Sequence, residues 1–415
     1  MSSRRATGFV LVLLLALDSF GREPIKSLPP TIQTRAVRAR DLGIPFEGTP
    51  GRLNAITDVP GVEVGYTTLI SGEGKLEVGK GPVRTGVTAI LPRGHASLND
   101  SVYAGFFSLN GNGEMTGTAW VEESGFLEGP IVITNTHSVG VARDAVIAWE
   151  VKQGAGGESL WSLPVVAETW DGWLNDINGF HVKPEDVWHA LDAAHGGAIE
   201  EGSVGGGTGM VCYEFKGGNG TASRVVSVAA AGSGDPGSQK ASRAYTVGLF
   251  LQANFGRRPQ LVIAGAPVGQ KIPGQVYKSA SADSSVGGQD LGSCIAVVAT
   301  DAPLLPNQLK RLVRRVSLGL ARTGTISGNS SGDLFIAFST ANPNVAGADQ
   351  ITHDVQTIPN DLMDPLFAGV VQATEEAVIN ALVDNHSMTG RDNHRVEALP
   401  HDRLREILKR FRSTQ

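Results

Sequence analysis

Short apolar runs bounded by glycine-rich turns alternate with longer segments of helical periodicity along most of the chain. Such runs predict buried strands, and in the first two thirds they occupy Gly86–Leu91, Pro130–Thr134, Arg224–Ala229 and Leu261–Gly265. Helical spacing predicts helices over Val139–Val151 and Pro184–Ala194, the second with a proline and acidic residues in its first turn.

The final third shows the same alternation more clearly. Strands are predicted over Ile295–Ala299 and Leu334–Phe338, and helices over Pro306–Arg322 and Asp364–Asn385. A last amphipathic helix carries its apolar side chains on one face, at Leu404, Ile407, Leu408 and Phe411. Buried strands and helices in mixed order, without an internal repeat, predict a layered α/β domain.

Two stretches fit neither pattern. Residues 22–50 are rich in proline, arginine and glycine, and we expect them to wrap the surface. Residues 266–292 combine two prolines, a Ser/Ala/Asp cluster and two consecutive glycines. A loop this long is uncommon inside a compact domain and is usually functional or disordered. Exposed small polar segments are also the places where chains are cut.

The N-terminus has the order of a secretory signal. Arg4 and Arg5 precede the apolar run Gly8–Leu17, and Ser19 and Gly21 then supply small residues before a cleavage point. The apolar run is shorter than the ~20 residues that a spanning helix needs. We therefore expect residues 1–21 to be removed and the protein to be periplasmic or secreted, with an uncleaved anchor as the alternative. No later segment is long and apolar enough to span a bilayer, so we expect no membrane partner.

The composition excludes several classes of protein. Of 415 residues, 41% are hydrophobic, 18% are charged and 53 are glycine, which suits buried elements joined by tight turns rather than disorder or a coiled coil. The net charge of -6 provides no field that would attract nucleic acid. We predict that the two cysteines, Cys212 and Cys294, are buried free thiols. The scattered histidines form no zinc motif, so we expect no metal.

Gly292 and Ser293 lie where the long loop meets the strand at Ile295, and this pair can carry chemistry. Because glycine has no side chain to hinder attack on its own carbonyl, the Ser293 hydroxyl could attack the Gly292 carbonyl and move the acyl group from nitrogen to oxygen. Water would then release a new terminus, whose α-amine, with a pKa of about 7.7–8.0, can serve as a base. The alternative is a plain junction between a loop and a strand.

Two further stretches place polar side chains near strand ends. Ser331 and Asp333 are two apart in Ser327–Asp333 and would point the same way if the next strand has begun there. The alternative is a hydrogen-bonded turn. Asn254, in Gly248–Gly256, carries an amide that can donate to a developing oxyanion, and the alternative is the end of a helix or strand.

A glycine run and an acidic–aromatic cluster complete the candidates. Gly205–Gly209 resembles a phosphate cradle, but neither a GK[ST] nor a GxGxxG pattern fits, which favours a tight turn that lets backbones approach. Glu168 and Trp170, in Glu168–Gly172, supply a carboxylate and a ring face that would suit an ammonium group. The alternative is an Asp-Gly turn with a packed tryptophan.

Together these stretches resemble one family. The run "GSCIAVVATDAPLLPNQLKRLVRRVSLGLARTG", followed by "SGNSSGDLFIAFSTANP", is similar to the L-aminopeptidase/D-Ala-esterase-amidase family, which includes the β-peptidyl aminopeptidases. "NGNGEMTG", "TNTHSVG", "ETWDGWLNDI", "GGGTGM" and "LQANFG" extend the resemblance over nearly the whole chain after the signal. It implies a four-layer α/β/β/α sandwich like that of N-terminal-nucleophile hydrolases, with its own connectivity. It also implies self-cleavage into two associated chains, 22–292 and 293–415, which form one folded domain and assemble as a homotetramer of such pairs.

The resemblance also assigns roles to residues. Ser293 becomes the nucleophile that cleavage after Gly292 exposes. Ser331 and Asp333 become the residues that orient and polarise it, and Asn254 becomes the oxyanion donor.

On the substrate side, Glu168 becomes the partner of the substrate's amino group. The family usually carries tyrosine where this chain has Trp170, so we expect a different pocket shape and a different choice of N-terminal residue. The predicted enzyme removes N-terminal β-amino acids or small L-amino acids from peptides, amides and esters that have a free amine. It works through an acyl-enzyme and needs no cofactor.

Two other functions stay open at this point. A same-fold acyltransferase of the ornithine-acetyltransferase type usually carries a threonine nucleophile, where this chain offers Ser293. A non-catalytic periplasmic binding protein would keep its long loop uncut. Denaturing electrophoresis separates the self-processing enzyme, which gives two chains, from the uncut binding protein.

Overall fold

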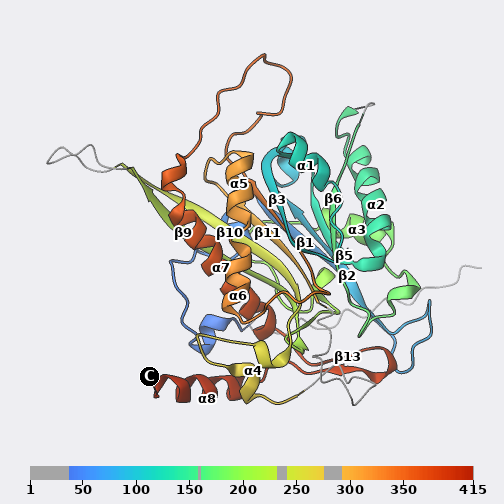
Figure 1. Ribbon diagram of the computed structural model, residues 1–415. Coiled ribbons are helices and arrows are strands. Elements are labelled where there is room, and N and C mark those ends of the chain that lie inside the picture. The colour runs from blue at the N-terminus through green and yellow to red at the C-terminus, as the bar shows by residue number, and fades with distance from the viewer. Residues whose placement is uncertain (1–36, 158–159, 231–240, 275–291, 415) are drawn as a thin grey trace, which may run out of the picture. The chain divides into compact units, whose positions relative to one another are not determined.

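Two β-sheets lie face to face and helices cover their outer faces (Figure 1). The computed structural model describes residues 37–157, 160–230, 241–274 and 292–414. The chain from Ala36 onward forms one compact unit. The predicted signal segment 1–21 and most of the predicted loop 266–292 lie outside the described residues.

The smaller sheet has four strands in the order β1-β2-β5-β6. These are Glu63–Ser71 (β1), Val83–Leu91 (β2), Ile131–Asn135 (β5) and Val165–Thr169 (β6). The β5 and β6 strands are parallel, so both end at the same edge of the sheet. Both are buried along their whole length, as their nearly continuous β-branched and apolar sequences require.

The larger sheet has six strands in the order β4-β3-β12-β11-β10-β9. These are Phe126–Leu127 (β4), Val102–Gly111 (β3), Gly332–Ser339 (β12), Ser293–Thr300 (β11), Ser242–Asn254 (β10) and Gly218–Ala229 (β9). The parallel strands β11 and β12 begin at one edge of this sheet, and the antiparallel strand β10 ends there. Three chain segments that are distant in sequence therefore meet at that edge.

Helices complete the four layers. On the smaller sheet pack Val139–Lys152 (α2) and Pro184–Asp192 (α3), at the right of Figure 1. On the larger sheet pack Pro306–Val313 (α5), Val316–Arg322 (α6) and Asp364–Val383 (α7), at its left. A separate apolar core fills the space between the sheets, with Ile295, Val297 and Ala299 of β11 in it. The predicted α/β/β/α sandwich is confirmed.

The remaining elements are short or peripheral. They are Thr118–Ser124 (α1), Val268–Lys271 (α4), His401–Arg412 (α8), Val211–Cys212 (β7), Phe215–Lys216 (β8), Met388–Thr389 (β13) and Arg395–Val396 (β14). The β7 and β8 strands form a two-stranded hairpin next to the larger sheet, where Val211 N–H donates to the side-chain oxygen of Asn254 at the end of β10.

The α7 helix is the core helix of the larger sheet. Among the described residues it alone is long and apolar enough to cross a membrane, yet 78% of its apolar window is buried inside the protein. It also carries a buried carboxylate, Glu376, which pairs with Arg224 at 2.7 Å and with Arg40 at 2.6 Å. A buried charge of this kind is tolerated because its partners are charged and close.

Two predicted elements differ in the structure. The strand predicted over Leu261–Gly265 is wrong: Ile263 and Ala266 bond to each other in a tight turn, and Ala264 between them has φ +49°. The run is apolar because it is buried as a loop. The single helix predicted over Pro306–Arg322 is divided into α5 and α6, because Arg315 N–H bonds three residues back instead of four and tightens the turn.

Candidate active site

Ser293 and Asn254 face each other across the edge where β10 ends and β11 begins. The antiparallel register makes them direct partners, and such partners have Cβ atoms about 4.5–5.5 Å apart on one face of a sheet. Asn254 Nδ2 lies 3.5 Å from Ser293 Oγ and donates to it. Each side chain is only 3% exposed, so the pair is shielded from bulk water.

The backbone amide of Trp170 is a second donor to Ser293. Trp170 directly follows β6, and its N–H donates to Ser293 Oγ at 3.3 Å. Asn254 Nδ2 also donates to the Trp170 carbonyl at 2.9 Å, and Asn254 Oδ1 accepts from Val211 N–H at 2.8 Å. Two N–H donors thus converge beside one hydroxyl, where they could reach an oxyanion that forms next to it. The sequence pointed to the Trp170 ring, whereas in the structure the backbone N–H of Trp170 contacts Ser293.

The peptide bond between Gly292 and Ser293 is held in place by the neighbouring strand. The Gly292 carbonyl accepts from Gly332 N–H at 3.2 Å, and the parallel register makes Gly332 the partner of Ser293. A Cβ on Gly332 would lie 2.4 Å from Asn112 O, so the strand fits at this point only as glycine. Backbone and side-chain donors therefore fix both the carbonyl oxygen of Gly292 and the hydroxyl of Ser293.

Ser331 and Asp333 flank Gly332 and form a hydrogen-bonded pair. Ser331 Oγ donates to Asp333 Oδ1 at 2.8 Å, and both side chains are buried. The register places Asp333 beside Cys294 rather than directly beside Ser293. The two side chains are bonded to each other at the start of the strand next to the Gly292–Ser293 junction, and their role toward Ser293 stays a prediction.

Asparagines near the end of β3 hold the turn that carries Ser331. Asn110 Nδ2 donates to Gly328 O at 2.6 Å, and Asn112 Nδ2 donates to Ser330 O at 2.6 Å. Sequence reasoning assigned these asparagines no role. The signal was the "NGNG" pattern, in which two amide side chains alternate with glycines that let strands approach closely.

Glu168 lies near the end of β6 and is 3% exposed. Its Oε1 accepts from Glu114 N–H at 3.1 Å and its Oε2 accepts from the Thr136 hydroxyl at 2.5 Å. Burial raises the pKa of Glu168, and these two hydrogen bonds offset part of the rise. A Cβ on Gly113 would lie 3.2 Å from Glu168 Oε1 and 3.1 Å from Gly332 Cα. The carboxylate therefore stands close to the β12 edge and suits a cationic group bound there.

The turn after Trp170 is fixed by a second acidic residue. Leu174 and Asn175 N–H groups donate to Asp171 O at 3.1 Å, and Asn175 Nδ2 donates to Asp171 Oδ1 at 3.0 Å. Burial raises the pKa of Asp171 to about 7. These bonds hold the segment that presents the Trp170 amide, and sequence reasoning assigned Asp171 only to a turn.

Both cysteines are buried and, among the described residues, they are not joined in a disulfide, as predicted. Burial raises the pKa of Cys294 well above its ordinary value, and the nearby Asp333 carboxylate raises it further. A thiol that stays protonated is a poor nucleophile. Cys294 therefore does not compete with its neighbour Ser293.

The predicted turn at Gly205–Gly209 is also confirmed. Gly205 has φ +51°, and its N–H donates to the Thr68 hydroxyl at 2.8 Å. A Cβ on Gly206 would lie 2.8 Å from Ile133 O. These glycines allow the turn to pack against the smaller sheet, which explains them without a phosphate.

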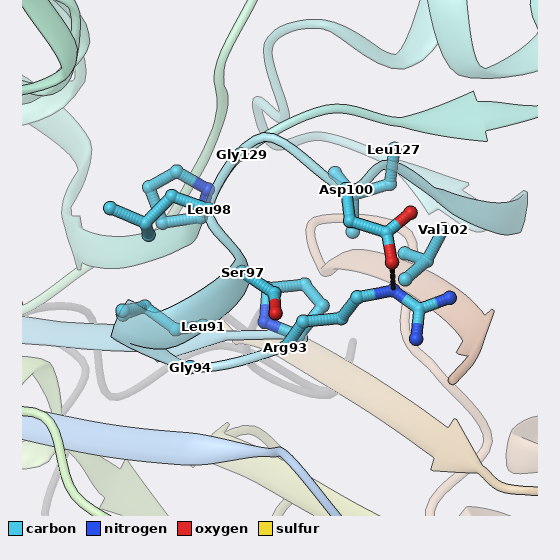
Figure 2. Close-up of a pocket in the computed structure, with 11 residues that line it drawn as sticks. Leu91, Arg93, Gly94, Ser97, Leu98, Asp100, Val102, Leu127 and Gly129 are labelled. Atoms are coloured by element: carbon cyan, nitrogen blue, oxygen red, sulfur yellow. Dashed lines mark ion pairs between the residues drawn. The ribbon is translucent and has the colours of Figure 1, made fainter. Parts of the chain in front are cut away.

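A small cavity at the other end of the strands does not belong to this site. It measures about 10 Å³ and adjoins the ion pair of Arg93 and Asp100, whose Nε and Oδ2 atoms are 3.0 Å apart (Figure 2). Val102 begins β3 there, whereas Gly111, at the other end of β3, pairs with Gly332. The cavity has room for about one water molecule, so it does not bind a substrate.

Comparisons with known proteins agree with this geometry. The model of "Peptidase family S58" matches residues 54–396. The chain is 53% identical over 384 residues to the β-peptidyl aminopeptidase BapA of Sphingosinicella microcystinivorans, which covers 90% of this chain and 92% of that protein. It is 47% identical over 415 residues to BapA of Sphingosinicella xenopeptidilytica, with 98% of each chain covered.

A solved structure gives the same result. The L-aminopeptidase D-Ala-esterase/amidase of Ochrobactrum anthropi, described as a prototype of the serine aminopeptidases and a new variant of the Ntn-hydrolase fold, superposes with a TM-score of 0.78 at 46% identity. The alignment covers 90% of this chain and 98% of that one. The chain therefore belongs to peptidase family S58, and it is a serine aminopeptidase with an Ntn-hydrolase-type fold.

Proposed function

We propose that the protein cleaves itself between Gly292 and Ser293 and then uses Ser293 as an N-terminal nucleophile. The observation that carries the proposal is the convergence of the Trp170 and Asn254 donors on Ser293 Oγ, at 3.3 and 3.5 Å, beside the Gly292 carbonyl. Neither an acyltransferase nor a binding protein is favoured by the match to a peptidase family.

The uncut geometry supports self-cleavage. Ser293 Oγ attacks the Gly292 carbonyl carbon, while Gly332 N–H holds the carbonyl oxygen that becomes negative. The C–N bond breaks, its nitrogen takes up the proton that the Ser293 hydroxyl gives up and becomes the α-amine of Ser293, and Gly292 is joined to Oγ as an ester. Water then hydrolyses the ester, which leaves Gly292 as a carboxylate and restores the hydroxyl.

The same groups serve turnover. The freed α-amine, with an ordinary pKa of about 7.7–8.0, accepts the hydroxyl proton as Oγ attacks the substrate carbonyl. Trp170 N–H and the Asn254 amide stabilise the oxyanion, and the proton passes to the leaving amine or alcohol. Water then attacks the acyl-enzyme and releases the N-terminal residue. The Ser331–Asp333 pair orients the new terminus from the adjacent strand.

We propose β-amino acids or small L-amino acids as the residues removed from peptides, amides and esters. Support comes from the names of the relatives, which are β-peptidyl aminopeptidases and an L-aminopeptidase. The buried Glu168 carboxylate binds the substrate ammonium, because a carboxylate in a shielded site interacts strongly with a cation. Trp170 limits the size of the side chain that fits beside it.

The two cleaved chains stay together as one domain. The β11 strand of the smaller chain pairs with β10 of the larger chain along eight residues of register, and α5, α6 and α7 cover the same sheet. We further propose export, with removal of residues 1–21 and a periplasmic or secreted location, and assembly into a homotetramer of these pairs. The export proposal is supported by the sequence alone.

The substrate proposal is tested with p-nitroanilides of β-homoamino acids, L-α-amino acids and D-α-amino acids. The wild-type protein should release p-nitroaniline from β-homoamino or small L-α substrates and far more slowly from substrates whose amine is acetylated. Ser293→Ala, folded by circular dichroism, should release none. Equal activity of wild type and Ser293→Ala would overturn the assignment of the nucleophile.

A further inference from the structure

Lys216 is a buried lysine to which the mechanism above gives no part. It lies in β8 and is 0% exposed. Its Nζ donates to two backbone carbonyl oxygens, those of Met210 at 2.9 Å and Gly217 at 2.7 Å. Burial lowers the pKa of Lys216 to about 7. Lysine is almost never fully buried without a specific reason, because the ammonium group loses its hydration.

Lys216 is joined to Asn254 through a single peptide group. The oxygen of the Met210–Val211 peptide accepts from Lys216 Nζ, and the N–H of the same peptide donates to Asn254 Oδ1 at 2.8 Å. The amide nitrogen of Asn254 then donates toward Ser293 Oγ. Lysine, peptide and side-chain amide therefore form one continuous row of hydrogen bonds that ends at the nucleophile.

The hairpin that carries Lys216 is firmly anchored. Its two turn residues, Tyr213 and Glu214, have φ +50° and +58°, as the two-residue turn of a β-hairpin requires. Arg258 Nε donates to Tyr213 O at 3.0 Å, and Arg257 Nε lies 3.0 Å from Glu214 Oε1. These two contacts fix the turn from which Lys216 extends.

We propose that Lys216 is a positioning residue of the oxyanion hole. By donating to the Met210 carbonyl, Lys216 orients the Val211 N–H that fixes the Asn254 amide. Its ammonium group also polarises the hydrogen bonds that run from Met210 O to Asn254. A hydrogen-bond donor at one end of such a chain strengthens the donors further along it. The inference rests on the proposed oxyanion role of Asn254.

Lys216→Met tests the proposal without removing the hairpin's other contacts. Methionine has a similar length, and it removes the cost of burying a charged group. Gly217 N–H still donates to Met210 O at 3.0 Å, so the backbone remains tied. We expect an unchanged or higher Tm, an unchanged KM and a kcat lowered by about tenfold, less than the 10²–10³ for loss of an oxyanion donor itself.

Two further variants separate positioning from general damage. Lys216→Gln keeps an N–H donor for Met210 O and should give a kcat between those of wild type and Lys216→Met. Lys216→Met combined with Asn254→Ala should turn over no more slowly than Asn254→Ala alone, because the lysine acts only through the asparagine. Lys310→Met, at a half-exposed lysine that pairs with Glu122, serves as the control and should leave kcat unchanged.

The outcomes are distinguishable. Wild-type turnover in Lys216→Met, or additive losses in the double variant, would overturn the positioning role and leave the proposed function intact. Normal turnover in Asn254→Ala would instead remove Asn254 from the oxyanion hole, and the role of Lys216 with it. Self-cleavage, measured by denaturing electrophoresis in each variant, gives the fraction of cut chain to which kcat is normalised.

Discussion

Replacing Asn254 with alanine removes the side-chain amide that lies between Val211, Trp170 and Ser293. Its contact with Ser293 Oγ is long at 3.5 Å, beyond the usual range of about 2.7–3.2 Å, so the contact is weak before reaction. In the proposed role the amide instead donates to the oxyanion that forms beside Oγ, and an interaction made only in the transition state raises kcat rather than lowering KM. We expect kcat to fall by about 10²–10³, or about 2.7–4 kcal/mol, with little change in KM.

The same substitution also affects stability, and this effect must be separated from catalysis. It leaves Val211 N–H and Trp170 C=O without the partners they have at 2.8 and 2.9 Å, at about 1–3 kcal/mol for each orphaned buried group. Asn380→Ala is a matched control, because this buried amide makes the same two kinds of backbone bond, from Ala39 N–H at 3.0 Å and to Thr221 O at 2.9 Å, in a different part of the core.

The assay combines steady-state hydrolysis of a p-nitroanilide with thermal unfolding of both variants. Asn254→Ala and Asn380→Ala should lose similar stability, and only Asn254→Ala should lose turnover. A third variant, Asn254→Asp, keeps the acceptor for Val211 N–H but loses the donor. It should therefore turn over at least as slowly as Asn254→Ala. If Asn254→Ala lost no more turnover than Asn380→Ala, the oxyanion assignment would be refuted.

Three further predictions concern Glu168, metal ions and Glu376. Glu168→Gln should raise KM for substrates with a free amine by about 10–100-fold, because a hydrogen bond to a charged group contributes ~1.5–3 kcal/mol. Since burial raises the pKa of Glu168, the KM of the wild type should rise as the pH falls toward that pKa, and the KM of the variant should not. Turnover should survive prolonged treatment with EDTA because no proposed step uses a metal, and a loss restored by added metal would contradict this. Glu376→Gln should lower the free energy of unfolding by about 3–5 kcal/mol by leaving Arg224 unpaired. Burial opposes ionisation of Glu376, but Arg40 and Arg224 hold its pKa below the usual value. Urea titrations at a series of pH values should therefore show that the wild type loses stability as the pH falls through that pKa, and that the stability of the variant depends less on pH in the acidic range.

The elements with a simple apolar pattern were predictable from the sequence, and those that depend on distant partners were not. The β11 and β12 strands are continuous apolar runs because they are buried on both faces. The β10 strand escaped prediction because its pattern is interrupted at Gly248, where a Cβ would lie 2.8 Å from Ile56 Cα. That glycine reflects a tertiary contact, which no local pattern records.

The site shows the same division. Ser293, Asn254, Ser331 and Asp333 could be named because their side chains belong to recognisable stretches. The Trp170 amide could not, since a backbone N–H has no sequence signal and this one lies 123 residues from Ser293. Lys216 was equally hidden, because its role depends on a peptide carbonyl that only the folded hairpin brings to it.

Intact mass measurement of purified wild-type protein and of Ser293→Ala tests the central claim most directly. The account predicts two chains for the wild type, with the larger ending at Gly292 and the smaller beginning at Ser293, and one uncut chain for the variant. A single uncut chain in active wild-type protein, or cleavage at the same bond in Ser293→Ala, would contradict it.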